Sequence, residues 1–399
     1  MNKELILIKV NGPDKPGITF KLLEVIGQGA HIVKDMGQSV THGLLSLSIL
    51  LEIQNTGNDY PVIKDLLFAA KKMGLSLDFE TFDEEINEIP ELSSEPKFIL
   101  NVVSTNIIPV AFLRDIAKTF SEQSVNIHRI DTIDPNEFTA LEITTSIAKN
   151  VHWDQLKEKL IAISNTYQVD AAFIRDDVWR RNKRLIVFDM DSTLIQTEVI
   201  DEMAIVQGVG DQVKKITELA MNGELDFNQS LQERVKLLKG MEEEKLHQIL
   251  EKLEFTTGAE KFIKTVKSLG YKVAVISGGF TFFAEALKTK LGLDYAFANE
   301  LEIVDGKLTG KVKGTIVNAE QKATLLKLIS QQEGINLEQV VAIGDGANDL
   351  PMLSAAGLGI AYHAKDIVRK QARNHMSHGP MTTILHFLGV SDQSFIDSI

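Results

Sequence analysis

Asp189 and Asp191 stand two residues apart, directly after an apolar run at residues 185–188. The run is typical of a buried parallel strand, so both carboxylates fall at the carboxyl end of a strand. Like charges at this separation repel, and burial makes it costlier to keep them ionised. A hard cation, a shared proton or a covalent role would offset this cost. The pair therefore indicates a chemical site.

Two further apolar runs also end at polar residues. These are Ser277, Gly278 and Gly279 after residues 273–276, and Asp345, Asn348 and Asp349 after residues 340–343. Because ligands of open parallel sheets bind beyond the carboxyl ends of the strands, we expect the three sets to converge. Acids and an amide without His or Cys form an oxygen-only donor set, which suits Mg²⁺.

A phosphate-binding role is indicated by the serine with its two glycines. Ser277 offers a hydroxyl, and the glycines allow backbone N–H groups to approach phosphate oxygens closely. Lys322 begins a predicted helix at residues 319–330 and could neutralise the same phosphate. Together with the acids, these residues predict phosphoryl transfer.

Each of these elements alone has an ordinary explanation. An Asp-x-Asp pair or a Ser-Gly-Gly stretch is most often a turn, and a single helical lysine is usually solvated. The glycine-rich acidic segment at residues 344–349 could simply end a strand and begin a helix. It is their order, each at the end of a strand or the start of a helix, that favours one shared site.

The elements that must position these residues form a doubly wound α/β domain. Short, non-alternating apolar runs at residues 185–188, 273–276, 295–298 and 340–343 are typical of strands covered on both faces, and helical segments lie between them. Residues 199–252 are mostly helical in pattern and too long for a simple crossover. We interpret them as an inserted helical cap.

The first half of the chain contains two copies of a smaller pattern. Residues 1–85 follow the order βαββαβ, and residues 98–175 repeat it. We expect domains at 1–85, 98–176 and 185–399, a linker at 86–97, a charged connector at 177–184 and the cap at about 199–255.

Composition narrows the class of protein. The 399 residues include 42 Lys or Arg against 55 Asp or Glu, and the net charge of −13 argues against nucleic-acid binding. The absence of cysteine excludes disulfides, thiolate metal sites and a cysteine nucleophile. The first residues lack a signal-peptide pattern, and no apolar stretch approaches the ~20 residues that span a bilayer. We expect a cytoplasmic protein without membrane association.

The motifs at the strand ends resemble those of a known family. Residues 185–390 are similar to the haloacid dehalogenase superfamily, through Asp-x-Asp-x-Thr, Ser-Gly-Gly, a lysine and Gly-Asp-Gly-x-Asn-Asp. Within it the chain resembles the phosphoserine phosphatase family, because of Phe-Asp-Met-Asp-Ser-Thr-Leu, the following Glu198, and Phe227 and Arg234 in the cap.

The resemblance implies a role for each residue. Asp189 would attack phosphorus, and Asp191 would protonate the leaving serine and then activate water. Mg²⁺ would be held by Asp189, the backbone carbonyl of Asp191 and Asp345, with Asp349 in or behind its ligand shell. The phosphoryl oxygens would be held by Ser277, Gly278 and Lys322, with help from Asn348. Thr193 would orient the nucleophile loop.

Phosphoserine, the substrate that the resemblance implies, carries two charged groups besides its phosphate. Glu198 matches the ammonium group, Arg234 matches the carboxylate through a bidentate fork, and Phe227 could shield the closed site from water. Both charges could instead be ordinary charges on the cap surface.

The two βαββαβ units resemble ACT domains, which often bind amino acids. The first carries Gly-Pro-Asp-Lys-Pro-Gly between its first strand and helix, so Asp14 and Gly17 are candidates for a ligand loop. The second has no glycine at the equivalent place. Both copies could instead serve only for dimerisation or docking.

We therefore expect a Mg²⁺-dependent hydrolase of O-phospho-L-serine that acts in the last step of serine synthesis. We further expect a homodimer, with a regulatory amino acid at the ACT-like domains. One alternative is a related phosphatase or phosphotransferase for another small phosphoester. The other is a non-catalytic amino-acid sensor.

Overall fold

The computed structural model describes residues 3–29, 31–54, 62–81, 96–133, 138–147, 151–221 and 224–390. The chain forms two compact units, residues 1–94 and 95–399. The predicted linker at 86–97 lies almost wholly outside the described residues. Within these ranges, the structure contains no helix long and apolar enough to cross a membrane.

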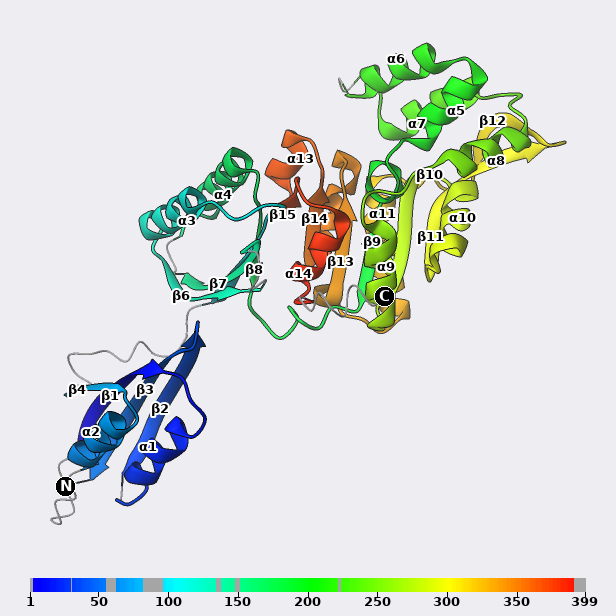
Figure 1. The fold of residues 1–399 in the computed structure, drawn as a ribbon. Helices are drawn as coiled ribbons and strands as arrows, with labels where there is room; N and C mark the ends of the chain where they lie inside the picture. The colour runs from blue at the N-terminus through cyan, green and yellow to red at the C-terminus, as the bar shows by residue number, and fades with distance from the viewer. Residues whose placement is uncertain are drawn as a thin grey trace. The chain divides into compact units, whose positions relative to one another are not determined.

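The first unit is a four-stranded antiparallel sheet with two helices (Figure 1). Its elements are β1 (Lys3–Pro13), α1 (Ile18–Ile26), β2 (Ile32–Thr41), β3 (Leu44–Gln54), α2 (Val62–Lys72) and β4 (Ser76–Thr81), and the strand order is β2-β3-β1-β4. Alternate residues of β1 and β3, such as Ile8 and Leu51, are buried against Leu22 of α1 and Leu66 of α2. The period-2 alternation of the strands thus provides one apolar face for the helices.

The second unit begins with the same arrangement. Its first six elements are β5 (Lys97–Val103), α3 (Val110–Glu122), β6 (Val125–Thr132), β7 (Ala140–Ile147), α4 (Trp153–Tyr167) and β8 (Asp170–Arg175). The strand order β6-β7-β5-β8 is equivalent to that of the first unit. Phe112, Ile116 and Phe120 of α3 fill its core.

The rest of the second unit is built on a seven-stranded sheet. Its strands are β9 (Leu185–Phe188), β10 (Lys272–Phe280), β11 (Tyr295–Val304), β12 (Lys307–Lys313), β13 (Val340–Gly344), β14 (Leu358–Tyr362) and β15 (Asn374–Met376). They lie in the order β12-β11-β10-β9-β13-β14-β15, with β12 antiparallel to β11 and the other neighbours parallel.

Helices cover both faces of this sheet, which explains the continuous apolar runs of its strands. One face packs against α9 (Ala259–Ser268), α10 (Thr281–Leu291) and α14 (Ile384–Phe387). The other packs against α11 (Ala319–Gln332), α12 (Leu350–Ala355) and α13 (Asp366–Gln371). β9 lies between β10 and β13, so the three motif-bearing strands are neighbours.

Four of the helices between β9 and β10 form the predicted cap. They are α5 (Val199–Gln207), α6 (Gly210–Met221), α7 (Phe227–Leu237) and α8 (Glu243–Lys252). The chain enters and leaves the cap through two paired segments, where Ile195 and Phe255 form an antiparallel bridge. The N–H of Gln196 donates to the carbonyl of Glu254 (3.0 Å) beside it. We call these paired segments, residues 194–197 and 254–258, the cap hinge.

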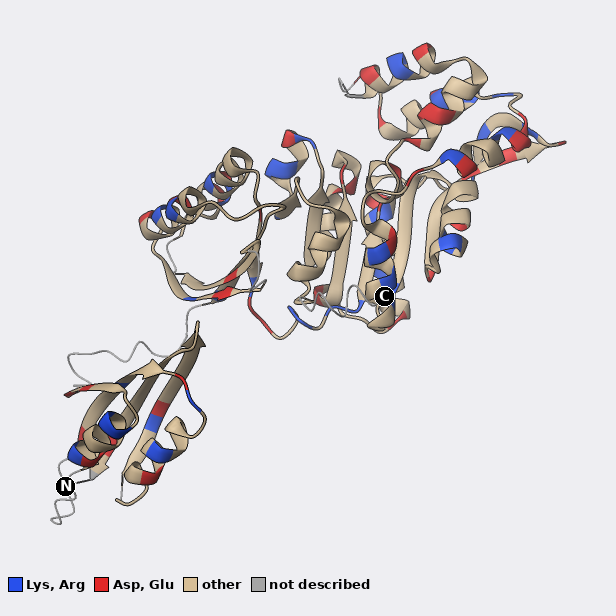
Figure 2. Ribbon diagram, viewed as in Figure 1, with Lys and Arg blue, Asp and Glu red and all other residues tan. Residues whose placement is uncertain are grey.

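The predicted fold class is confirmed: two βαββαβ domains precede a doubly wound α/β domain with an inserted helical cap. Acidic and basic residues are intermixed along the cap helices and along α3 and α4 (Figure 2). β12, β14 and β15 are strands that the sequence analysis did not predict.

Candidate active site

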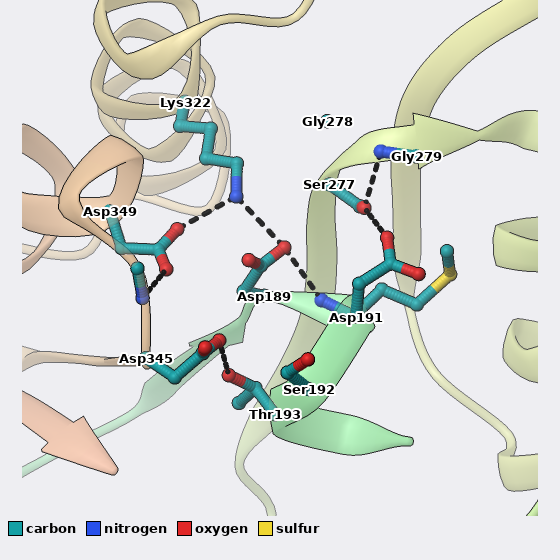
Figure 3. Close-up of polar contacts among 12 residues, drawn as sticks. Asp189, Asp191, Ser192, Thr193, Ser277, Gly278, Gly279, Lys322, Asp345 and Asp349 are labelled. Carbon is teal, nitrogen blue, oxygen red and sulfur yellow. Dashed lines mark hydrogen bonds and ion pairs between the residues drawn. The ribbon is translucent and has the colours of Figure 1, made fainter. Parts of the chain in front are cut away.

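The polar residues that follow β9, β10 and β13 lie together at one edge of the sheet, as Figure 3 shows. Asp189 follows β9, Ser277 lies near the end of β10, and Asp345 and Asp349 follow β13. Lys322, from the first turn of α11, reaches into the same place. The edge is the one at which parallel α/β sheets bind ligands.

Lys322 is fully buried and links two of the acids. Its Nζ lies 2.8 Å from Asp189 Oδ1 and 2.7 Å from Asp349 Oδ1. Burial alone would lower the pKa of Lys322, but the two carboxylates more than reverse this effect and raise the pKa. The lysine is therefore held as a cation beside Asp189.

The peptide after Asp189 fixes the orientation of its carboxylate. The N–H of Met190 donates to Asp189 Oδ1 (2.7 Å), the oxygen that also contacts Lys322. Both identified partners therefore hold Oδ1, which turns the carboxylate so that Oδ2 is presented to the site.

The acids at this edge could hold a metal ion. Asp189, Asp345 and Asp349 each offer a carboxylate oxygen, and these oxygens all lie within 4.8 Å of one another. Thr193 donates its hydroxyl to Asp345 Oδ1 (2.9 Å) and so fixes the orientation of one candidate ligand. The all-oxygen donor set fits a hard divalent cation.

The electrostatics of these acids also favour a bound cation. Burial and then the charge of Asp349 raise the pKa of Asp189 well above its usual value. The same two causes raise the pKa of Asp345 to about 6. Three carboxylates around one lysine leave an excess of buried negative charge, and a divalent cation would neutralise it and lower these pKa values.

Asp191 has different partners from Asp189. It accepts hydrogen bonds from the N–H of Val199 (2.9 Å) and the hydroxyl of Ser277 (3.1 Å). Burial, followed by the charge of Glu198, raises its pKa to about 7. Asp191 can therefore exchange a proton near neutral pH, which a general acid and base requires.

The Ser-Gly-Gly segment approaches this acid so closely that a side chain at Gly279 would have to displace it. A Cβ on Gly279 would lie 2.5 Å from Asp191 Oδ2. The N–H of Gly279 donates to Ser277 Oγ (2.8 Å), which fixes the hydroxyl between the loop and Asp191. Asn299 of β11, which is buried, supports the loop by donating to the carbonyl of Gly278 (2.8 Å).

The cap reaches the site through the beginning of α7. A Cβ on Gly278 would lie 2.9 Å from Cζ of Phe227, so the ring lies directly over this glycine. The neighbouring Asn228 accepts a hydrogen bond from Asn318 (3.4 Å), the residue that caps α11. The cap is thus in contact with the Ser-Gly-Gly segment and with the beginning of α11.

Glu198 and Arg234, the two residues predicted to bind the substrate's charged groups, interact electrostatically. Burial raises the pKa of Glu198, which also accepts the hydroxyl of Ser192 (2.9 Å). Burial lowers the pKa of Arg234, while the charges of Glu198 and Asp191 act in the opposite direction. Its Nε donates to the carbonyl of Ser230 within α7 (3.3 Å), and the described residues provide no ion-pair partner for its terminal nitrogens.

The remaining predicted residues lie in two places. Asn348 is in the short turn between Asp345 and Asp349, beside the acids. Asp14 and Gly17 belong to the first unit, where Gly17 has a left-handed backbone (φ 93°) at the start of α1 and Asp14 is exposed. The positive φ accounts for a glycine at this point of the loop.

Three supporting residues were missed or incompletely predicted. Asn299 follows the apolar run at 295–298, so the rule that identified the other strand ends would have found it. Ser192, with φ 56°, directs its hydroxyl to Glu198 and had no sequence signal. Thr193 was expected to orient the nucleophile loop, and its hydroxyl bonds the more distant Asp345.

Comparison with known proteins agrees with this geometry. A family model for haloacid dehalogenase-like hydrolase matches residues 186–354, and a model for the ACT domain matches residues 4–80. Phosphoserine phosphatases of Streptomyces coelicolor and Mycobacterium tuberculosis are each 39% identical over 389 residues. These alignments cover 97% and 98% of this chain and 92% and 94% of the relatives.

A solved structure is also similar. The unliganded crystal structure of a probable phosphoserine phosphatase from Vibrio cholerae has a TM-score of 0.58 and 36% sequence identity, and the match covers 80% of this chain and 94% of that chain. Fold, site and family models together define a haloacid dehalogenase-like hydrolase that carries an ACT domain. Because relatives match over nearly its whole length, the chain belongs to the phosphoserine phosphatase family.

Proposed function

We propose that the protein hydrolyses O-phospho-L-serine to L-serine and phosphate through an aspartyl phosphate on Asp189. The observation that carries this proposal is the different environment of the two neighbouring acids. Asp189 contacts the cation of Lys322, whereas Asp191 contacts an N–H and a hydroxyl and has a pKa of about 7. One acid is suited to attack, and the other to proton transfer.

In the first step, an oxygen of Asp189 attacks phosphorus, and the bond between phosphorus and the serine oxygen breaks. Asp191, protonated, donates its proton to the departing serine oxygen. The charge of Lys322 acts to lower the pKa of Asp189 against the effect of burial, and it balances the negative charge on the phosphoryl oxygens. L-serine leaves, and Asp189 carries the phosphoryl group.

In the second step, Asp191 acts in the reverse direction. Now ionised, it accepts a proton from a water molecule that attacks the phosphorus of the aspartyl phosphate. The bond between phosphorus and Asp189 breaks, phosphate leaves, and Asp191 is again protonated for the next cycle. Without substrate, the hydroxyl of Ser277 donates to Asp191 and holds its carboxyl group in place.

We assign the metal site to Mg²⁺. Asp189, Asp345 and the backbone carbonyl of Asp191 would hold it, with Asp349 in or behind the ligand shell. The ion would supply charge neutralisation for the phosphoryl group. Ser277, Gly278 and Asn348, together with Lys322, are assigned to the phosphoryl oxygens.

Substrate selection is assigned to the cap side of the site. Glu198 would bind the ammonium group of phosphoserine, and Arg234, whose terminal nitrogens have no ion-pair partner among the described residues, would bind its carboxylate. Phe227, which lies over Gly278, would exclude water from the closed site.

The test is phosphate release from O-phospho-L-serine, compared with sugar phosphates and with phosphoethanolamine, which lacks the carboxylate. We expect kcat/KM to be highest for phosphoserine, and phosphoethanolamine to lose at least the contribution of the contact with Arg234. Equal or better hydrolysis of sugar phosphates would contradict the proposal and favour a different phosphoester.

The N-terminal half is proposed to regulate and assemble the enzyme. The loop with Asp14 and Gly17 would bind a regulatory amino acid. Phe20, Met36 and Val40 are exposed apolar side chains on the first unit, which supports a homodimer formed through that unit. We also propose that the domains have the boundaries predicted from the sequence. The enzyme would act in the last step of serine synthesis, in the cytoplasm. Titration with serine and light scattering test ligand binding and assembly.

A further inference from the structure

The second βαββαβ domain is packed against the α/β domain. Val103, Ala172 and Ile174 from its sheet belong to the same buried apolar cluster as Leu385 and Phe387 of α14. β8 lies beside β15, the last strand of the larger sheet (Figure 1). This domain therefore buries a sheet face against the half of the chain that carries the site.

The carboxylate of Asp170 accepts hydrogen bonds across this boundary. Asp170, the first residue of β8, is 1% exposed. Its Oδ1 accepts the N–H of Ser377 (2.6 Å), and its Oδ2 accepts the N–H groups of His378 (3.0 Å) and Gly379 (2.9 Å). Three charge-assisted hydrogen bonds thus hold three successive peptides of the loop after β15.

The same loop is held from its other side. The carbonyl of Gly379 contacts the ring nitrogen of His363 (3.0 Å) and the hydroxyl of Tyr362 (3.4 Å), both at the end of β14. Arg369 donates to the hydroxyl of Ser377 (3.2 Å). The loop is fixed between the second βαββαβ domain and the larger sheet. On the side of the βαββαβ domain, Asp170 accepts the N–H groups of all three loop residues, 377–379.

Just after this loop, the chain contacts the cap hinge. The N–H of Met381 donates to the carbonyl of Thr257 (2.9 Å). Gly258 lies close to Thr382, the residue after Met381: a Cβ on this glycine would lie 3.2 Å from the backbone nitrogen of Thr382. The position of residues 377–382 therefore determines where the returning segment of the hinge can lie.

The hinge in turn contacts the residues around the acids. The N–H of Thr256 donates to the carbonyl of Leu194 (3.0 Å), and its hydroxyl donates to the carbonyl of Thr193 (2.7 Å). Thr193 then donates to Asp345 Oδ1 (2.9 Å). A continuous series of hydrogen bonds and short chain segments connects Asp170 to a candidate metal ligand.

We propose that Asp170 is a positioning residue: by fixing the loop at residues 377–379 it sets the cap hinge and, through Thr256 and Thr193, the orientation of Asp345. The second βαββαβ domain is then a structural part of the metal site. This inference rests on the proposed assignment of Asp345 as a metal ligand. Because Asp170 acts through other residues, its loss should weaken metal binding without removing it.

The test compares Asp170→Asn with the unaltered full-length chain. The amide keeps the shape of the side chain, but its NH₂ group replaces one oxygen that accepts a hydrogen bond. Two donors, the NH₂ group and a backbone N–H, then face each other. Mn²⁺, titrated without substrate and followed by electron paramagnetic resonance, is the probe. We expect its dissociation constant to rise about 3- to 10-fold, below the 10- to 100-fold typical of a residue bonded directly to a metal ligand.

Lys157→Met is the matched control. Lys157 Nζ donates to the carbonyl of Lys370 (2.8 Å), so it crosses the same boundary but ends on α13 and not on the loop. We expect this variant to bind Mn²⁺ like the unaltered chain. An equal weakening in both variants would mean that any loosening of the boundary matters, and it would overturn the specific role of Asp170.

Thr256→Val tests the same route if Asp170→Asn fails to fold. It removes the hydroxyl bonded to Thr193 without touching the boundary, and we expect it to weaken Mn²⁺ binding as well. The double variant should bind Mn²⁺ more tightly than the product of the two single effects predicts, because both changes act on one route. Unchanged Mn²⁺ affinity in either single variant, or simple additivity, would overturn the proposal. Failure to hydrolyse phosphoserine would instead contradict the proposed function, because Mn²⁺ binding is measured without substrate.

Discussion

Replacing Lys322 by methionine removes the only positive charge in contact with Asp189 and Asp349 among the described residues. The lysine is 0% exposed and lies 2.8 Å and 2.7 Å from these two carboxylates. Methionine has a similar length, so the substitution removes charge and hydrogen bonds with little change in volume. What remains is a group of buried acids without a cation.

The size of the effect follows from the burial of these contacts. Removing one partner of a buried ion pair typically costs about 3–5 kcal/mol, because the other charge stays buried without compensation. We expect a loss of this size in the free energy of unfolding of the metal-free protein at pH 8. The loss of a preorganised contact to the phosphoryl group should lower kcat by about 10²–10³.

The raised pKa of Asp345 also determines how the loss of stability in Lys322→Met changes with pH. Asp345, with a folded pKa raised to about 6, binds a proton more readily when folded than when unfolded, so its protonation favours the folded state at low pH. Without Lys322, the acids repel each other more strongly when ionised. The destabilisation of Lys322→Met should therefore be largest above pH 7 and shrink as the pH falls below about 6.

The assay is chemical unfolding of the metal-free protein, followed by circular dichroism at pH 8 and pH 5. Lys327→Met, an exposed lysine on the same helix, is the matched control. We expect the control to unfold like the unaltered chain. If Lys322→Met and Lys327→Met have equal stability at pH 8, the electrostatic account of the site is wrong.

Three further predictions concern proton transfer and the cap. The rate of phosphoenzyme formation, measured by rapid quench, should fall about tenfold per pH unit above the Asp191 pKa of about 7, because this step needs the protonated acid; a flat profile from pH 6 to 9 would contradict the assignment. Arg234→Lys should raise KM for phosphoserine about 10-fold while leaving KM for phosphoethanolamine nearly unchanged, because the lysine cannot form the bidentate contact; equal effects on both substrates would remove the carboxylate assignment. Gly278→Ala should raise KM and lower kcat, because the new Cβ would lie 2.9 Å from Phe227 and hold the cap open; pairing it with Phe227→Leu should restore part of the activity, and no recovery would argue against this contact.

The sequence was sufficient to predict the strands that carry chemistry. The strand predicted at 185–188 agrees with β9, because a strand covered on both faces is a continuous apolar run. β14 and β15 were missed. β15 has three residues, Asn374, His375 and Met376, and its burial comes from tertiary packing rather than from an apolar pattern. β12 is a half-exposed edge strand whose pairing with β11 depends on the turn at residues 305–306.

For the site, residue types predicted which groups meet but not how each is oriented. That Lys322 bridges Asp189 and Asp349 follows from the register of α11 against the sheet, which no local pattern encodes. The bond between Thr193 and Asp345 likewise joins residues 152 positions apart. Contacts across the boundary at Asp170 depend on how two domains pack, so they became visible only in the structure.

The most direct test of the account is to look for the phosphorylated aspartate. Phosphoserine labelled in its phosphate is mixed with the enzyme and quenched in acid within milliseconds, and the protein is separated and digested. The account predicts label on the peptide that contains Asp189, release of that label by hydroxylamine, and no label in Asp189→Asn. Turnover of phosphoserine without protein-bound label at any quench time, or label that persists in Asp189→Asn, would contradict it.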